Sequence, residues 1–201
     1  MNITSIAYTT DGQTLVTSTM GEPLKVWDVK KLVSQPKIPS DSAQIIATAI
    51  SPDGCYAVTS STHGHGQVLN PKSGEVYHRF QCMPYVASQL SVTSDSQTAL
   101  ACVKDRFYVW TIKTGEVCHT LESSAPITAF LVMPSGHEIY CVNNAGILQH
   151  WSLESGQLLK EWHGMPTEKI KISYLFERQQ LLITTEADPL ENLYNHPRDI
   201  N

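Results

Sequence analysis

Two short turn patterns recur along this chain with a common period of about 41 residues, and this repetition constrains the fold more than any other feature. The first pattern is a glycine turn at Gly74, Gly115 and Gly156, with steps of 41 and 41 residues. The second is a tight turn at Asp11-Gly12, Asp53-Gly54, Asp95-Ser96 and Ser135-Gly136, with steps of 42, 42 and 40 residues. Five positions before each glycine stands Leu69, Trp110 or Trp151, and a further step of 42 back reaches Trp27. The chain is therefore built from repeats.

Within each repeat, short β-branched or aromatic segments are separated by turn residues, a pattern typical of strands rather than helices. The third repeat shows this best, with expected strands at Val86–Val92, Thr98–Val103, Phe107–Ile112 and Val117–Leu121. The segment Arg106–Trp110 places large apolar side chains on both faces of its sheet. Since a sheet with one face in water alternates apolar and polar residues, both faces here need a cover. Small four-stranded sheets stacked face to face predict an all-β propeller architecture.

The repeats resemble those of the WD-repeat family of β-propellers, through Leu24–Asp28, Ile50–Gly54 and the three glycine turns, and the resemblance covers about Ile3 to Thr185. It implies that the strand before each Asp-Gly turn lies innermost, that the Trp-bearing strand is third and that the fourth lies outermost. The expected inner strands are Ile3–Tyr8, Ile45–Ile50, Val86–Val92, Ile127–Val132 and Ile170–Leu175. Structural roles in packing and turns are assigned to Trp27, Trp110, Trp151, Gly74, Gly115 and Gly156.

The chain also departs from the family pattern in several places. The Gly-His dipeptide of the family is absent, Leu69 replaces one Trp, and among the periodic Trp residues only Trp27 is followed by Asp. Asp105 alone approximates the buried turn aspartate of the family. The side-chain network that links Asp, His, Ser or Thr and Trp in strong WD repeats is therefore expected to be broken in most blades.

We expect one propeller segment over residues 1–185, with units at about 1–42, 43–83, 84–124 and 125–165, a partial unit at 166–185 and a loosely ordered tail at 186–201. Four and a half units allow either a small closed wheel with a defective last blade or an open arc cut from a larger protein. We expect the arc, because the sequence begins at an inner strand and ends partway through a blade. An arc leaves apolar blade faces uncovered, which favours self-association.

Composition and charge exclude several classes of partner. The 14 Lys and Arg against 19 Asp and Glu give a net charge of −5, which repels phosphate backbones and anionic lipids, so neither nucleic acid nor a membrane is an expected partner. The first 20 residues contain no Lys or Arg, unlike a secretory signal. The longest apolar stretch, Ala125–Met133, is too short to span a bilayer. Five cysteines without a Cys-x-x-Cys pair favour reduced thiols in a cytoplasmic protein.

The sequence offers no catalytic or metal-binding constellation. His63 and His65 share one turn, but a metal site needs a third or fourth ligand and none is recognisable. Cys118 and His119 are neighbours on an expected strand, so their side chains point to opposite faces and cannot form a dyad. The aspartates at 11, 53 and 95 recur with the period and are interpreted as turn formers. We expect no enzyme activity, no metal and no cofactor.

The expected function is protein or peptide binding. In the WD-repeat family, the connections between second and third strands lie on the face where partners usually bind. Here those connections contribute Glu22, His63, His65 and Arg106 as candidate contact residues. The favoured interpretation is a noncatalytic scaffold module within a larger signalling or scaffold protein. The alternatives are a truncated product without stable independent function and a propeller hydrolase.

Overall fold

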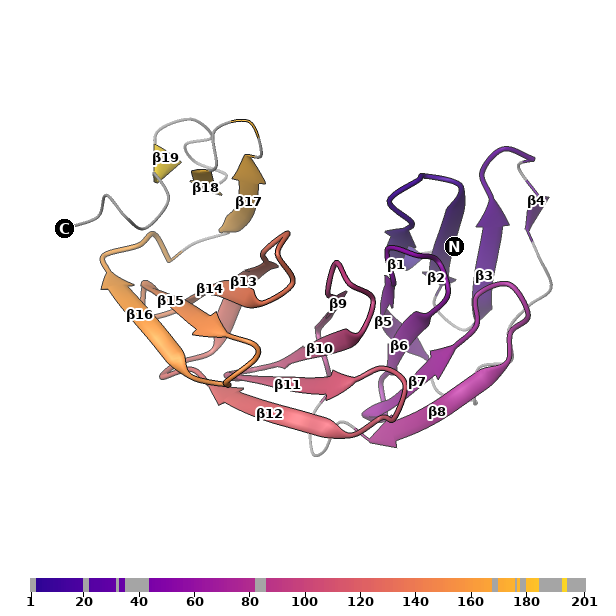
Figure 1. The fold of residues 1–201 in the computed structure, drawn as a ribbon, viewed down its shortest axis with the longest axis horizontal. Helices are drawn as coiled ribbons and strands as arrows, with labels where there is room; N and C mark the ends of the chain where they lie inside the picture. Colours follow the sequence, from indigo (N-terminus) through magenta and orange to yellow (C-terminus); the bar gives the residue numbers. More distant parts are fainter. Residues whose placement is uncertain are drawn as a thin grey trace. The chain divides into compact units, whose positions relative to one another are not determined.

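A computed structural model gives the fold as a series of small antiparallel sheets (Figure 1). It describes residues 3–19, 22–31, 33–34, 44–81, 86–167, 170–175, 177, 180–184 and 193–194. In these residues every regular element is a β-strand, and no sheet closes into a barrel. The predicted all-β fold with blade-like four-stranded sheets is confirmed. The chain divides into two compact units, residues 1–120 and 121–201, and the open-arc arrangement, which concerns both units together, stays a prediction.

The first unit holds three sheets, each with its four strands side by side in chain order. The first sheet consists of β1 (Ile3–Tyr8), β2 (Thr14–Thr19), β3 (Glu22–Asp28) and β4 (Val33–Ser34). The second consists of β5 (Ile45–Ile50), β6 (Ala57–Ser61), β7 (His65–Leu69) and β8 (Val76–Gln81). The third consists of β9 (Gln89–Val92), β10 (Thr98–Val103), β11 (Arg106–Thr111) and β12 (Val117–Glu122), whose last two residues fall in the second unit.

Neighbouring sheets of the first unit join through equivalent positions of their first strands. Thr4 Oγ1 donates to the Ile45 carbonyl at 2.9 Å, and Thr48 N donates to Ser5 Oγ at 3.0 Å. Each contact links residues about one repeat apart, so β1 and β5 run in the same direction. Equivalent turns of successive sheets therefore lie at the same end of the unit.

Each interface between these sheets follows one pattern of facing side chains. Val16 and Val26 of the first sheet share an apolar cluster with Ile50, Ala57 and Leu69 of the second. One repeat later, the equivalent valines of the second sheet share a cluster with Ala99, Ala101 and Trp110 of the third. These residues are all at most 8% exposed, which accounts for the apolar character of both faces of the middle sheet.

Gly66 creates a second contact between the second and third sheets. Gly66 pairs with Phe80 across β7 and β8, and a Cβ at residue 66 would lie 2.1 Å from the Phe80 ring. The glycine thus leaves room for the Phe80 ring beside β7. Phe80 then packs on Trp110 of the third sheet, with ring centroids 4.6 Å apart.

The second unit contains one complete sheet and one three-stranded sheet. The complete sheet consists of β13 (Ile127–Val132), β14 (Glu138–Asn143), β15 (Ile147–Ser152) and β16 (Leu158–His163), and the other of β17 (Lys171–Leu175), β18 (Gln180–Thr184) and β19 (Leu193–Tyr194). Tyr140, Leu148, Leu181 and Ile183 belong to one buried cluster. The sequence did not reveal β19, because two paired residues carry no periodic pattern. Residues 185–192 and 195–201 lie outside the described part, so the tail boundary stays a prediction.

The aspartate turns have the geometry that was predicted for them. Asp11 Oδ1 accepts hydrogen bonds from Thr9 Oγ1 at 2.5 Å and from Gln13 N at 2.9 Å. The same two bonds recur around Asp53 and around Asp95. The interpretation of these carboxylates as turn formers is confirmed.

The hydrogen bond of the periodic tryptophan is present in the first sheet and absent around Trp110 and Trp151. Trp27 Nε1 donates to Thr17 Oγ1 at 2.9 Å, whereas the buried Nε1 atoms of Trp110 and Trp151 have no hydrogen-bond partner. The strand register explains the difference, because Ala101 and Cys141 occupy the position equivalent to Thr17. Neither side chain offers a hydroxyl oxygen to the indole.

We expect the substitution Cys141→Thr to stabilise the protein. It places a hydroxyl near Trp151 Nε1, as Thr17 does for Trp27, and one satisfied buried donor contributes about 1 kcal/mol to the free energy of unfolding. The matched control is Cys141→Val, which has the same shape without the hydroxyl. Urea unfolding of the two variants measures the difference, and equal stability of the Thr and Val proteins would contradict the assignment.

Candidate functional site

The topology of the first unit defines two ends that carry different turns. In each sheet the strands follow one another antiparallel. Hydrogen bonds join equivalent positions of neighbouring sheets, from Thr48 N to Ser5 Oγ and from Asp53 N to Ser96 Oγ. The turns β2–β3, β6–β7 and β10–β11 therefore lie at one end, which we call the upper end. The turns β1–β2, β3–β4, β5–β6, β7–β8, β9–β10 and β11–β12 lie at the other, which we call the lower end.

Glu22 and Arg106, two of the predicted contact residues, begin the third strands of the first and third sheets. Glu22 Oε2 accepts a hydrogen bond from Lys25 Nζ at 2.6 Å. Arg106 is exposed, and its Nε lies 3.9 Å from Asp105 Oδ1, which is a long ion pair. Both residues are at the upper end, on sheets that are separated by the second sheet.

His63 and His65 lie in and directly after the β6–β7 turn of the second sheet, and both are exposed. The Nδ1 atom of His63 lies 3.5 Å from Thr62 Oγ1. In the part of the chain that the structure describes, no group of three or more His, Cys, Asp or Glu residues has the geometry of a metal site. The upper end thus gathers four candidate side chains from three sheets, with the histidines in the middle.

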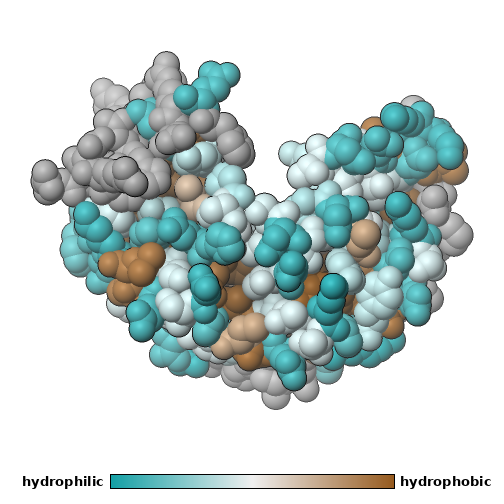
Figure 2. Space-filling view, viewed as in Figure 1, coloured by the Kyte–Doolittle hydropathy of each residue, from teal (hydrophilic) through white to brown (hydrophobic). Residues whose placement is uncertain are grey.

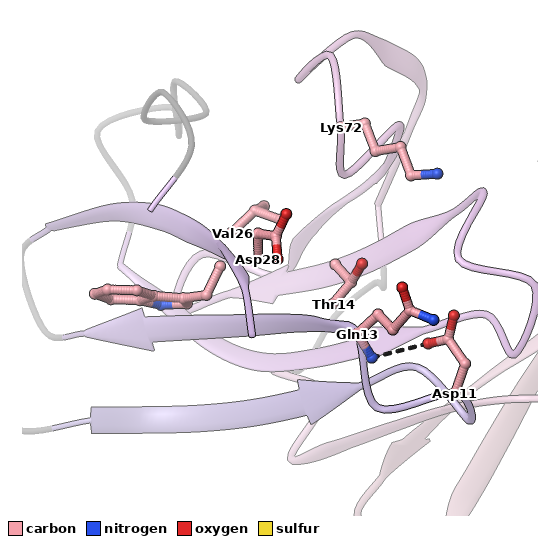
Figure 3. Close-up of a pocket in the computed structure, with 7 residues that line it drawn as sticks. Asp11, Gln13, Thr14, Val26, Asp28 and Lys72 are labelled. Carbon is pink, nitrogen blue, oxygen red and sulfur yellow. Dashed lines mark hydrogen bonds between the residues drawn. The ribbon is translucent and has the colours of Figure 1, made fainter. Parts of the chain in front are cut away.

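A pocket lies at the lower end of the first unit, where sequence reasoning had not placed a site (Figure 3). Its volume is about 270 Å³, and it is lined by Asp11, Gln13, Thr14, Val26, Trp27, Asp28 and Lys72. Lys72 comes from the β7–β8 turn of the second sheet and the other lining residues from the first. None of the four predicted contact residues contributes to it. The periodicity of the Asp and Lys turns was the signal that could have placed these residues at one end.

The carboxylates of this pocket are already engaged by their own turns. The hydrogen bond from Thr9 Oγ1, and then the one from Gln13 N, lower the pKa of Asp11, with a smaller contribution from Lys72. The backbone N–H of Lys31 lowers the pKa of Asp28, whose Oδ2 also lies 3.3 Å from Lys31 Nζ. The pocket is therefore a polar depression with ionised carboxylates, and it is suited to binding a polar group rather than to proton transfer near neutral pH.

The buried cysteine Cys102 has the surroundings of a structural residue. Burial raises the pKa of Cys102 to about 12, so its thiol stays protonated at neutral pH. On β12, Cys118 is exposed and its Sγ lies 3.2 Å from Thr111 Oγ1, while His119 is half-buried. This difference in exposure agrees with side chains that point to opposite faces of the strand.

Among the described residues, no helix has the length and apolar character needed to cross a membrane.

Comparison with known proteins gives a similar sequence and similar solved structures. No protein-family model matches the chain. The sequence is 20% identical to Autophagy-related protein 16 of Arabidopsis thaliana over 193 residues, which cover 95% of this chain and 38% of that protein. The fold is similar to that of a chain in the solved structure of hydrazine synthase from Kuenenia stuttgartiensis, with a TM-score of 0.78 and 14% identity. That match covers 94% of this chain and 58% of the other, and at this identity it shows the fold alone.

We expect the aspartate turns to make stability depend on acid pH. The carboxyl of Asp53 is partly desolvated, which opposes ionisation, but hydrogen bonds from Ser51, Cys55 and Ser96 prevail and lower its pKa below 3.8. Because the pKa of Asp53 and that of Asp11 are lower in the folded state, their contribution is present above pH 3.8 and is lost as the pH falls through the folded-state values.

The double substitution Asp11→Asn with Asp53→Asn tests this expectation. Urea unfolding between pH 3 and pH 7 should show a weaker pH dependence for the double variant than for the wild type. Asp105→Asn removes a loop carboxylate whose ion pair with Arg106 is long, and it serves as the control. An unchanged pH profile of the double variant would contradict the role of the two turns.

Proposed function

We propose that this chain is a noncatalytic WD-repeat scaffold module that binds a protein or peptide partner through the turns of its upper end. The proposed contact residues are Glu22, His63, His65 and Arg106, and the module is part of a larger signalling or scaffold protein. The observation that carries the proposal is the repeated sheet architecture, which presents solvent-accessible side chains from three consecutive sheets at one end of one compact unit.

The strands next to these turns are packed in the core and hold the contact residues in fixed positions. Leu24, Gly66 and Phe107 follow closely after the upper turns and are buried, so the contact residues begin directly at the edge of a packed core. A partner that binds there meets side chains that are held by sheets rather than by long loops. Rigid presentation lowers the conformational entropy that binding costs.

The chemistry of the proposed contact residues suits a protein partner. Glu22 and Arg106 carry opposite charges, and the two histidines between them provide ring surfaces and polar nitrogens. The net charge of −5 opposes binding to a nucleic acid. Such a mixed surface favours a peptide or protein that carries positive and negative charges as well as polar groups.

Two further observations support a noncatalytic role. The cysteine thiol of Cys102 is buried with a raised pKa, and the neighbouring Cys118 and His119 differ in exposure as residues on opposite strand faces do. The residues that line the pocket include carboxylates that already accept hydrogen bonds from the turns. The activity in the name of hydrazine synthase belongs to that protein, because 14% identity extends only to fold.

The sequence similarity supports a repeat module without identifying the partner. It extends over 95% of this chain, so it includes all the repeats and not one turn pattern alone. The chain spans 38% of the length of Autophagy-related protein 16, which suits a module within a larger protein. The autophagy role in that protein's name is not proposed for this chain.

The proposal predicts that partner binding depends on the upper end and not on the lower. The test variant replaces Glu22, His63, His65 and Arg106 with alanine, which leaves the net charge unchanged. The control replaces Lys72, Glu75, Lys113 and Glu116, which are exposed turn residues at the lower end with the same balance of charges. Immobilised chains capture partners, and the affinity of each captured protein is then measured after its purification.

We expect the affinity of a partner to fall at least about tenfold with the upper-end variant and to stay within about twofold with the control. Loss of binding by the control alone would indicate that the partner binds at the lower end instead. Equal affinities of the wild-type and upper-end proteins would refute the proposed contact residues. A matched thermal unfolding of all three proteins shows that the variants are folded.

A further inference from the structure

The first sheet presents an apolar face that no described residue of its own unit covers. We call it the free face and define it by Ile3, Ile6, Tyr8, Leu15 and Trp27. Ile3, Ile6 and Tyr8 are 59%, 55% and 71% exposed, and Leu15 and Trp27 are half-buried. The register places all of them on one side, because Tyr8 pairs with Leu15, Leu15 pairs with Trp27, and Ile6 pairs with Thr17, which bonds the Trp27 indole.

The equivalent positions are buried in the second sheet and buried or half-buried in the third. In the second sheet, the row Tyr8, Leu15 and Trp27 is replaced by Ile50, Ala57 and Leu69, which are 8%, 0% and 1% exposed. In the third sheet the row is Val92, Ala99 and Trp110, and the last two are 0% and 2% exposed. The free face is therefore the side that this architecture normally covers with another sheet.

In those two sheets, the equivalent face is covered by an apolar face of the preceding sheet. Val16 and Val26 cover the second sheet, and Val58 and Val68 cover the third. These valines point away from the free face and are already buried. No described residue of the first unit therefore supplies an apolar cover for the free face. Three exposed large apolar residues on a single six-residue strand form an unusually apolar patch for a surface that stays in water.

The charges on the free face are balanced within one molecule. Lys25 pairs with Thr17 and thus lies on the same side as Trp27, and its Nζ is 2.6 Å from Glu22 Oε2. Two identical free faces can consequently approach without repulsion between unpaired charges. The rest of the chain, with a net charge of −5, is less suited to self-association.

We propose that the free face is a self-association surface that binds the free face of a second copy of this chain. A contact between two identical patches is closed by a two-fold axis, so it gives a dimer and does not extend further. The contact buries Ile6 and Tyr8 of both copies against apolar side chains, in the way that Ile50 and its neighbours are buried in the second sheet. Glu22 pairs with Lys25 of the free face and is also a proposed upper-end contact, but the inference does not depend on partner binding at the upper end.

Sedimentation equilibrium of the purified chain over a range of concentrations tests the proposal. We expect a reversible equilibrium between monomer and dimer. The test variant Ile6→Lys with Tyr8→Lys adds two charges to the free face. The matched control is Val117→Lys with Leu159→Lys, since Val117 and Leu159 are 60% and 50% exposed, lie on strands and are outside the free face.

The dimer dissociation constant should rise at least about tenfold in the test variant and stay close to that of the wild type in the control. A wild-type chain that stays monomeric at all concentrations would overturn the proposal. So would a dimer that survives the test variant, a dimer that the control weakens equally, or open-ended larger assemblies. If the Lys variant unfolds, Ile6→Thr with Tyr8→Thr keeps the strand propensity while it removes apolar area, and the same weakening is expected.

Discussion

Burial of the sheet faces against neighbouring sheets is the constraint on which the rest of this structure depends. A sheet of four strands with five or six residues each has little interior of its own, and it gains its core from its neighbours. The valines at positions 16, 26, 58 and 68 supply that core in the first unit. Polar networks contribute less, since the buried indoles of Trp110 and Trp151 have no hydrogen-bond partner. Packing therefore maintains the repeat where its polar pattern has been lost.

The turns made much of the fold predictable from the sequence. Ile3–Tyr8, Ile45–Ile50 and Ile127–Val132 were expected as inner strands and have those bounds in the structure, because an Asp or Ser turn marks the end of each. The third inner strand is shorter than expected and begins at Gln89, where continuous pairing with Cys102 starts. Turn chemistry is local and visible in the sequence, whereas the beginning of a strand depends on pairing with a distant residue.

The candidate sites were less predictable than the fold. The strand order sufficed to place Glu22, His63, His65 and Arg106 at one end, although their role in binding is a proposal. The lower pocket was missed, because Asp11 and Lys72 were interpreted as turn residues of separate repeats and their proximity arises from the stacking of two sheets. On the face shown in Figure 2, apolar residues lie in small groups among hydrophilic ones, and composition alone does not reveal which group is functional.

The missing side chain at Gly66 has a consequence for how firmly the second and third sheets of the first unit are joined. Its second and third sheets are tied near their inner strands, where Ser96 Oγ accepts from Asp53 N, and again further out, where Phe80 rests on Trp110. Two separate contacts between the same two sheets oppose their rotation as well as their separation. The absence of a Cβ at Gly66 thus gives this pair of sheets a second contact, which we expect to resist rotation of one sheet against the other.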